Sequence, residues 1–539
     1  MKQLKVLLYG SPIGTLMFDG RSYKFAYDGD SEPPHPLSLS LPLSPEFRNV
    51  REDFGGQFAT LPHYFENLLP EGWLLDVARS MQRAERADKL DLLYELCRNT
   101  LGAVSFARDI AATHAIDLAT EVARQQDAAR SSYDLLHCGF CSSRLVRRGD
   151  NAGFHPHCSM AFFGTETPPE IDVDRQNLRR VALEHLARGE SITGSQEKFS
   201  MKYRYRDKAM VVPGLSFIVK PMQPNHPEIK DLPRMEHVIM RFGDALALGV
   251  AKTAFIRLRD GTDAFITRRF DRASDGRLVH AEDMAQATGD TRGLGHTYNG
   301  SYEVIARTLK HRLADQAKSR SSRLRFLRAT LFNYIFGNTD AHLKNHSIIW
   351  EPGEGGRQVF SLAPLYDIVP CLLYTDDDDE LGLPLGGKTK GFTRADFDYL
   401  AEILDLPARE IDSFVAETRG ARQLLVDLAR AYEVDQTRIA TLFELAARRI
   451  AVLSGAGAPT QRPRAVSTGG STLAAERVLA DGKTPIGRFG PDGVNEPALC
   501  HSAVCLNPAG RTRLRGRRRR ELGMCSYCNP EGLPPSQSL

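Results

Sequence analysis

The chain has 539 residues, of which 42% are hydrophobic and 25% charged, and its formal net charge is +3. This length exceeds what one hydrophobic core supports, and the composition excludes a chain that is disordered throughout. No run of about 18 apolar residues occurs, which argues against a membrane-spanning helix and a membrane partner. Residues 1–10 lead directly into a strand-like pattern without a signal-peptide cleavage site, so we expect a cytoplasmic protein.

Short apolar runs and turn pairs such as Asp19-Gly20 alternate in residues 4–62. This alternation is typical of β-hairpins. Residues 64–101 change to a helical period with a leucine stripe, which is more often core than interface. The stripe consists of Leu90, Leu92, Leu93 and Leu96. We therefore predict a β-rich subdomain with additional helices over residues 1–110.

The segment 138–158 contains a CxxC pair and, after residues 142–154, an HxxC pair. Four such ligands suit a tetrahedral zinc ion, and paired cysteines in a reducing compartment favour metal over disulfides. The predicted ligands of this closed, structural site are Cys138, Cys141, His155 and Cys158. His157 stays open as the alternative histidine, and so does a chance grouping of cysteines in a polar loop. We assign residues 111–180 to a linker and a small zinc-knuckle-like insertion.

Helical and strand patterns alternate in residues 181–300, which predicts a nucleotide-binding lobe. Its strand Phe217–Lys220 ends at the position from which a kinase lysine reaches the α and β phosphates, and Glu236 in the helix predicted at 235–248 is the candidate partner. A solvated edge charge is the commoner role for such a lysine. The small polar loop that follows residue 190 is not a Walker loop but suits phosphates, which its backbone N–H groups would cover. Its candidate ATP-binding residues are Gly194, Ser195 and Gln196.

Helical patterns dominate residues 301–455, and this lobe carries the clearest chemical signal. Phosphoryl transfer needs a carboxylate that orients the attacking hydroxyl, together with an amide oxygen and a second carboxylate that hold Mg²⁺. Asp340 and Asn345 have the Asp-x4-Asn spacing of a kinase catalytic loop, and Asp367 follows them. We predict that Asp340 orients the hydroxyl and that Asn345 and Asp367 bind Mg²⁺. Alone, the spacing is a weak signal, because Asp and Asn are common in turns.

Residues 456–539 are rich in glycine, proline, serine, threonine and arginine, and we expect them to be largely disordered. The arginine-rich run 511–520 suits contact with the phosphate backbone of a nucleic acid. Two cysteine pairs flank this run and have a spacing that suits a second zinc ion. They are Cys500, Cys505, Cys525 and Cys528. A disordered basic tail with incidental cysteines is the alternative.

Taken together, these motifs resemble the HipA family of serine/threonine kinases, the toxins of bacterial type II toxin–antitoxin modules. The resemblance covers about residues 5–450 and implies an α+β, two-lobed protein-kinase-like fold. That fold has an N-terminal β-rich subdomain and a mostly helical C-terminal lobe, and some members carry a zinc-knuckle-like insertion similar to Phe154–Cys158. The matching segments, in family order, are Pro42-Leu43, Phe65–Gly72, Gly194–Lys198, Val219–Pro221, Arg269–Arg272, Glu282–Gln286, Asn338–Asn345 and Pro364–Asp367.

Carried over by position, the resemblance gives the lysine, the two aspartates and the asparagine the roles assigned above. It adds His342 and Lys344 as groups that neutralise charge at the γ-phosphate. The chain departs from the family at Ala281, where an amide often reaches the nucleotide. This departure removes one polar contact and leaves the catalytic set complete.

The resemblance implies an ATP- and Mg²⁺-dependent serine/threonine protein kinase that inhibits growth by phosphorylating a cellular protein, for example a translation component. Autophosphorylation of Ser191 at the start of the phosphate loop would silence it, with Thr193 and Ser195 as second choices. The implied partners are an antitoxin with a helix-turn-helix and, through that antitoxin, DNA. The alternative is a catalytically silent module that docks an antitoxin and operator DNA. A small-molecule kinase is disfavoured by the N-terminal subdomain.

Overall fold

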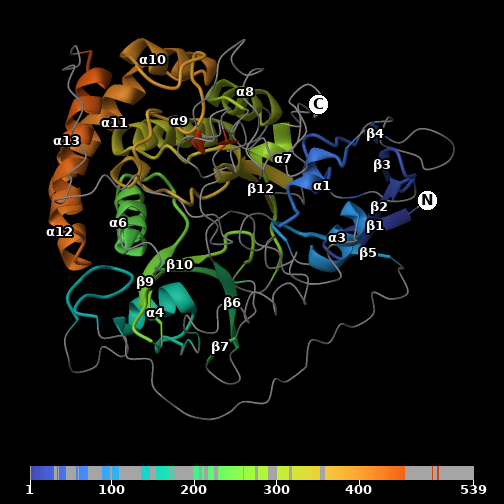
Figure 1. Cartoon of the computed structure of the whole chain (residues 1–539), viewed down its shortest axis with the longest axis horizontal. Coiled ribbons are helices and arrows are strands. Elements are labelled where there is room, and N and C mark those ends of the chain that lie inside the picture. Colours follow the sequence, from blue (N-terminus) through green and yellow to red (C-terminus); the bar gives the residue numbers. More distant parts are fainter. Residues whose placement is uncertain are drawn as a thin grey trace.

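The structure of the chain is a computed structural model (Figure 1). Its described residues form two five-stranded sheets, one three-stranded sheet and one two-stranded sheet. No helix within them is long and apolar enough to cross a bilayer. The described residues are 2–29, 33, 35–43, 56–58, 60–70, 88–97, 100–108, 135–145, 153–169, 171, 173, 198–204, 209–211, 216–223, 229–258, 260–273, 277–288, 300–314, 318–352, 358–455, 488–489 and 495–496.

The N-terminal unit is an antiparallel sheet in the order β4-β3-β2-β1-β5. Strand β1 turns into β2 at Tyr9 and Gly10, whose φ angles of 53° and 79° belong to the tight turns that join hairpin strands. Helices α1 and α3 pack on this sheet, and the predicted leucine stripe contributes to their shared core. The bounds are β1 Lys2–Leu8, β2 Ser11–Phe18, β3 Tyr23–Tyr27, β4 Gly56–Phe58, β5 Val104–Ala107, α1 His63–Glu66 and α3 Lys89–Leu96.

The second sheet, in the order β7-β6-β8-β10-β9, lies between helices α4 and α6 (Figure 1). Alternate residues of β10 face opposite sides, as strand geometry requires. Ala264 and Ile266 join the core on the α4 side, whereas Phe265 joins the core that contains α6. The bounds are α4 Pro156–Phe163, β6 Phe199–Arg204, β7 Ala209–Val211, β8 Phe217–Pro221, α6 Leu232–Ala245, β9 Thr253–Arg257 and β10 Asp263–Arg268.

Helix α6 begins and ends earlier than the predicted 235–248. Pro233 lies in its first turn, where the missing N–H has no intrahelical partner to lose. At the other end, Ala247 and Gly249 have φ angles of 55° and 64°, which turn the chain away from the helix. The core-facing residues are nevertheless those that the amphipathic pattern indicates, with Met235, Val238 and Phe242 buried.

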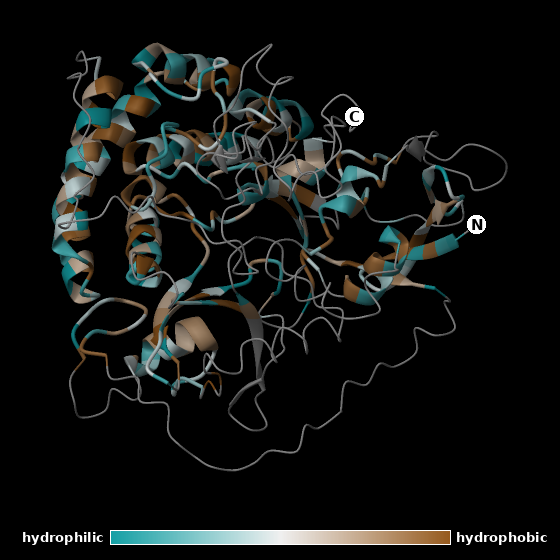
Figure 2. Cartoon of the chain, viewed as in Figure 1, coloured by the Kyte–Doolittle hydropathy of each residue, from teal (hydrophilic) through white to brown (hydrophobic). Residues whose placement is uncertain are grey.

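The C-terminal half combines the three-stranded sheet β11-β12-β13 with helices that share one large core. Helix α9 is buried on most of its surface from Phe326 onward, whereas α12 and α13 alternate hydrophilic and hydrophobic residues, as expected of helices with one exposed face (Figure 2). The bounds are β11 His280–Asp283, α7 Met284–Thr288, α8 Tyr302–Arg312, α9 Ser319–Phe336, β12 Ser347–Pro352, β13 Gln358–Leu362, α10 Arg394–Ile403, α11 Arg409–Gly420, α12 Arg422–Ala431, α13 Gln436–Leu453, β14 Arg488–Phe489 and β15 Asn495–Glu496.

A buried ion cluster joins the N-terminal unit to the second sheet. The Asp271 carboxylate accepts hydrogen bonds from Arg269 Nη2 at 2.6 Å, from Arg272 Nη1 at 2.9 Å and from the Gly102 N–H at 2.9 Å. Both arginines also donate to the Thr100 carbonyl at 3.0 Å. The pKa of Asp271 falls to about 2, because the two guanidinium charges outweigh the effect of burial.

A second polar contact joins the N-terminal unit to the three-stranded sheet, through Glu282 in β11. Its carboxyl group accepts hydrogen bonds from Ser38 Oγ at 2.6 Å and from the Leu39 N–H at 3.0 Å. Burial raises the pKa of Glu282 to about 8. The neighbouring Ala281 is itself buried, and a Cβ on Gly102 would lie 2.7 Å from its backbone N and O atoms. The β11 strand is therefore packed directly against the N-terminal unit.

Candidate active site

Lys220 lies between two carboxylates at the centre of the candidate site. Because Val219 faces the α4 side of β8, Lys220 faces α6 on the opposite side of the strand. Its Nζ donates to Glu236 Oε1 at 2.6 Å and also forms an ion pair with Asp367 Oδ1. The Lys220 and Glu236 side chains are only 6% and 1% exposed. The pair predicted from a strand lysine and a helix glutamate is thus present as a buried contact.

The pKa values of the two carboxylates shift in opposite directions, because nearby positive charges outweigh desolvation at Asp367 but not at Glu236. Burial raises the pKa of Glu236 to about 7 against the opposing charge of Lys220. Asp367, whose side chain is 33% exposed, has its pKa lowered to about 2, because the charges of Lys220 and Lys198 outweigh desolvation. Burial also lowers the pKa of Lys220, but the charges of Asp367 and Glu236 raise it overall. Lys220 is therefore charged at neutral pH, and Asp367 is ionised and paired with it.

The predicted catalytic loop begins where α9 ends at Gly337, whose φ of 73° reverses the chain. Asn338 orders the loop, since its Oδ1 accepts from the Asp340 N–H at 3.2 Å and its Nδ2 donates to Asn333 Oδ1 at 3.1 Å. Asn345 Nδ2 donates to the Asp340 carbonyl at 2.7 Å. This bond occupies the amide nitrogen of Asn345, so the amide oxygen is the atom that would bind a cation.

Tyr366 links this loop to Asp367. Its hydroxyl donates to the Lys344 carbonyl at 2.6 Å and lies 2.6 Å from Ser347 Oγ. The next residue, Asp367, has a φ of 59°, a left-handed conformation that costs energy for a residue other than glycine. Such conformations persist where surrounding contacts fix them, and here the Tyr366 contacts and the Lys220 pair supply that restraint.

His342 and Lys344 lie in the same loop. The His342 N–H donates to the Asp340 carbonyl at 2.8 Å, and His342 contributes to the lowered pKa of Asp367, so it lies within electrostatic range of that carboxylate. The Lys344 side chain belongs to a residue that is only 7% exposed. His342 therefore lies near the Asp367 carboxylate and is more exposed than Lys344, which is buried in the same loop.

Arg325 of α9 supports the site, and no motif in the sequence predicts this role. Its guanidinium donates to the carbonyls of Leu248 at 3.2 Å and Gly249 at 2.9 Å, and to those of Leu362 at 2.9 Å and Ala363 at 2.8 Å. These carbonyls belong to the connection from α6 to β9 and to the segment that leads to Asp367. An arginine in a helix gives no sequence signal of this role, because most such arginines are exposed.

The predicted phosphate loop, with Gly194, Ser195 and Gln196 and the candidate phosphorylation sites Ser191 and Thr193, lies outside the described residues. The tail cysteines Cys500, Cys505, Cys525 and Cys528 lie outside them as well. Lys198 follows the loop directly, and its charge affects the pKa of both Asp367 and Glu236. The chain therefore leaves the predicted loop close to the carboxylate pair.

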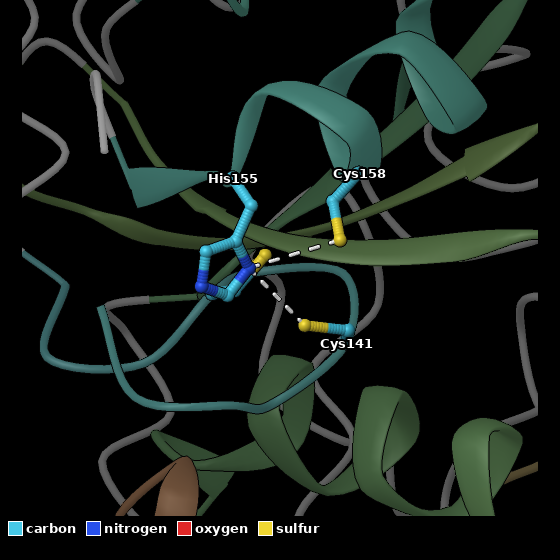
Figure 3. A group of neighbouring side chains, drawn as sticks. Cys141, His155 and Cys158 are labelled. Atoms are coloured by element: carbon cyan, nitrogen blue, oxygen red, sulfur yellow. Dashed lines mark hydrogen bonds between the residues drawn. The ribbon is translucent and has the colours of Figure 1, made fainter. Parts of the chain in front are cut away.

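A second group of candidate side chains lies in the predicted knuckle. Cys138, Cys141, His155 and Cys158 place their ligand atoms within 4.8 Å of one another. His155 Nδ1 points toward the sulfurs (Figure 3), 3.4 Å from Cys141 Sγ and 3.8 Å from Cys158 Sγ. Tetrahedral zinc with ordinary bond lengths requires nitrogen–sulfur separations of about 3.6 Å. His157 is exposed, and its ring stacks on His155 at 5.3 Å, so the grouping contains His155 and not His157.

The sequence matches two protein families and several known proteins. Residues 4–107 match the HipA N-terminal domain, and residues 190–426 match the HipA-like C-terminal domain. Y4dM of Sinorhizobium fredii, provisionally named a kinase, is 26% identical over 452 residues, which cover 79% of this chain and 88% of that protein. The serine/threonine-protein kinase toxin HipA of Shewanella oneidensis is 26% identical over 211 residues, covering 36% of this chain and 46% of the toxin.

A solved structure shows the same fold. The complex of HipA, HipB and operator DNA from Shewanella oneidensis MR-1 contains a chain that superposes with a TM-score of 0.54 at 18% identity, covering 84% of this chain and 97% of the other. The two matched domains contain the N-terminal β-rich unit and the lobe with Lys220, Glu236 and Asp367. On this evidence, the chain belongs to the HipA family.

Proposed function

We propose that the chain is an ATP- and Mg²⁺-dependent serine/threonine protein kinase that acts as the toxin of a toxin–antitoxin module. One observation carries the proposal, namely the buried Lys220 between Glu236 and Asp367. The Asp340–Asn345 loop supports it, because Tyr366 ties this loop to Asp367 through the Lys344 carbonyl. A lysine–glutamate pair, a cation-binding aspartate and a catalytic loop are the parts that kinase chemistry requires.

Each side chain has a role that follows from its surroundings. Lys220, held by Glu236, would bind the α and β phosphates, and Asp367 with the Asn345 amide oxygen would hold Mg²⁺. Asp340 would orient the substrate hydroxyl and accept its proton, while His342 and Lys344 would neutralise charge near the γ-phosphate. Bound Mg-ATP supplies the phosphoryl group and the metal charge.

Phosphorylation of the phosphate loop is the proposed means of regulation. Ser191 is the first candidate, and Thr193 and Ser195 follow. A phosphate adds about −2 of charge, which would oppose the ATP phosphates and displace the loop from the nucleotide. Since the loop's glycine and glutamine would contact ATP through their backbone N–H groups, this charge would act on nucleotide binding before catalysis.

The proposed partners are a protein substrate, an antitoxin with a helix-turn-helix, and DNA reached through that antitoxin. The Shewanella oneidensis structure contains HipA together with HipB and operator DNA. Its shared fold supports the same kind of assembly for this chain, with the antitoxin docked through residues 1–110. The arginine-rich run 511–520 is a second candidate contact with nucleic acid.

We further propose that Cys138, Cys141, His155 and Cys158 hold one structural zinc ion. A closed set of four nitrogen and sulfur ligands leaves no position for a reacting water, which is typical of structural sites. Hydrogen bonding with Cys138 lowers the pKa of Cys141, whereas the pKa values of Cys138 and Cys158 are raised, so binding of the metal would release protons from these two thiols. Metal analysis is expected to find one zinc ion per chain, and two would implicate Cys500, Cys505, Cys525 and Cys528.

Transfer of phosphate from radiolabelled ATP, measured alongside growth arrest, tests the kinase proposal. Asp340→Ala and Asp367→Ala are each expected to lower the rate by about a thousandfold or more, because each removes a group that acts in the transition state. Asp398→Ala is the matched control, since that aspartate is 41% exposed and pairs with Arg394 on the surface. Antitoxin binding with equal, negligible transfer by wild type and variants would instead support a silent binding module.

A further inference from the structure

Two consecutive carbonyls of the CxxC loop contact two different parts of the molecule. The Cys138 carbonyl accepts a hydrogen bond from Tyr432 Oη at 2.8 Å, and Tyr432 directly follows α12 of the helical lobe. The Gly139 carbonyl accepts from the Phe255 N–H at 2.8 Å, in β9 of the second sheet. The loop between the first two cysteines therefore bridges the sheet and the helical lobe.

Tyr432 lies where three elements meet. Its ring centroid is 4.6 Å from that of His237 in α6 and 5.9 Å from that of Phe255 in β9. Phe140, also between the two cysteines, lies 5.4 Å from the guanidinium carbon of Arg241 in α6. Through Phe140, the CxxC loop thus contacts α6, the helix that carries Glu236.

Glycine is required at the second position of this loop. A Cβ on Gly139 would lie 2.2 Å from the Phe255 carbonyl oxygen and 2.9 Å from the Phe154 ring. The first distance is far below van der Waals contact and involves a backbone atom, so no side-chain movement relieves it. The close approach to β9 therefore depends on the absence of a side chain at residue 139.

The metal ligands lie at both ends of the bridging segment. Cys138 and Cys141 would bind the same ion, which fixes the peptide groups between them. The free energy of metal binding at such a site contributes to folding, because the loop takes up its ligand-binding conformation when the ion binds. Without the ion, the loop is held by a few bonds of its own, such as Gly139 N–H to the Gly153 carbonyl at 2.9 Å.

We propose that the metal bound by Cys138, Cys141, His155 and Cys158 braces the second sheet against the helical lobe through the Cys138 and Gly139 carbonyls, and thereby holds α6 in place. This brace is independent of the kinase proposal, since it is tested by the zinc content of the protein and by hydrogen exchange in its helices and strands. Its effect on ATP binding through Glu236 rests on the proposed function.

Hydrogen exchange with mass spectrometry tests the brace. In the full-length protein, removal of zinc by a chelator is expected to speed exchange in β9, α6 and the end of α12, while α8 stays unchanged as an internal reference. Tyr432→Phe keeps the ring and all four metal ligands but removes one hydrogen bond, so exchange at these elements should rise by about fivefold with zinc content unchanged.

Gly139→Ala separates metal binding from bracing. It keeps the four ligands, so the protein should still hold one zinc ion, or one Co²⁺ ion with thiolate charge-transfer absorption. Exchange in β9 should nevertheless match that of chelator-treated wild type, and chelation should add little. Gly420→Ala is the control, because a Cβ there has no atom within 4 Å.

Two results would overturn the proposal. One is exchange that rises on chelation only within residues 138–163 and leaves β9, α6 and α12 as before. The other is Tyr432→Phe exchange that equals wild type while zinc is retained. A wild type that shows the brace but transfers no phosphate would leave the inference standing and refute the kinase proposal alone.

Discussion

Replacement of Asp271 by asparagine should weaken the docking of the N-terminal unit by about 3 kcal/mol, because removal of one partner from a buried ion pair leaves uncompensated charge. Asp271 is 1% exposed, and the Arg269 and Arg272 side chains are 5% and 9% exposed. The pKa of Asp271 falls from its ordinary 3.8 to about 2, which corresponds to about 2 kcal/mol of stability at neutral pH. The loss expected from the broken ion pair and the stability that corresponds to the pKa shift thus agree in order of magnitude.

Urea unfolding followed by tryptophan fluorescence measures this loss at the junction itself. Trp350 is 1% exposed, and its ring lies 5.4 Å from His35 of the N-terminal unit. The only other tryptophan in the sequence is Trp73, so a Trp73→Phe background makes Trp350 the single reporter. Asp398→Asn, which alters an exposed ion pair, is the control and should change little.

The pH dependence of the same difference follows from the sign of the shift. A carboxyl group whose pKa is lowered by folding stabilises the protein above its ordinary pKa. The difference between wild type and Asp271→Asn should be complete above about pH 4 and shrink as the pH falls toward about 2. A loss below about 0.5 kcal/mol at pH 7, the range of ordinary surface substitutions, would refute the assignment of the junction to this cluster.

Three further outcomes are expected. Burial raises the pKa of Glu282 to about 8 from its ordinary 4.5. The unfolding free energy of wild type, relative to that of Glu282→Gln, should therefore fall as the pH rises from about 4.5 to about 8 and stay constant above. A difference in unfolding free energy that does not change with pH would contradict this. Arg325→Met should raise the Mg²⁺ concentration for half-maximal phosphoryl transfer severalfold, because the segment before Asp367 loses its clamp, whereas Arg320→Met, at a side chain that is 63% exposed, should not. Mass spectrometry after incubation with Mg-ATP should find phosphate on Ser191, or otherwise on Thr193 or Ser195, and Ser191→Asp should bind ATP more weakly; phosphate only elsewhere with normal ATP binding would favour a helix-capping role for Ser191.

The parts of the site that local sequence predicts are those in which a motif and its strand or helix are contiguous. Lys220 at the end of a strand and Glu236 in the next helix meet, because α6 lies on the face of β8 to which Lys220 points. The Asp340–Asn345 contact forms within one loop. The period of apolar residues and the spacing of motif residues are sufficient to predict such contacts, since each contact joins segments that are close in the sequence.

Contacts between distant segments were not predictable in the same way. Tyr366 and Lys344 meet only after the chain has passed through β12 and β13, and Arg325 clamps carbonyls from two other segments. The sheet β11-β12-β13 also crosses the lobe boundary predicted at residue 300, because β11 pairs with β12 from the other side of it. Helix α9 gives little amphipathic signal, because it is buried on most sides.

The Lys220 ion pairs also bear on how ligands enter the site. With Asp367 and Glu236 both in contact with one ammonium group, charges that would attract a cation and an anion already neutralise each other. A metal ion at Asp367 would release Lys220 for a phosphate, and a phosphate at Lys220 would release Asp367 for the metal. If the site binds both ligands, each would raise the affinity for the other by the same factor, as thermodynamic linkage requires. The site should take up metal and nucleotide as a cooperative pair.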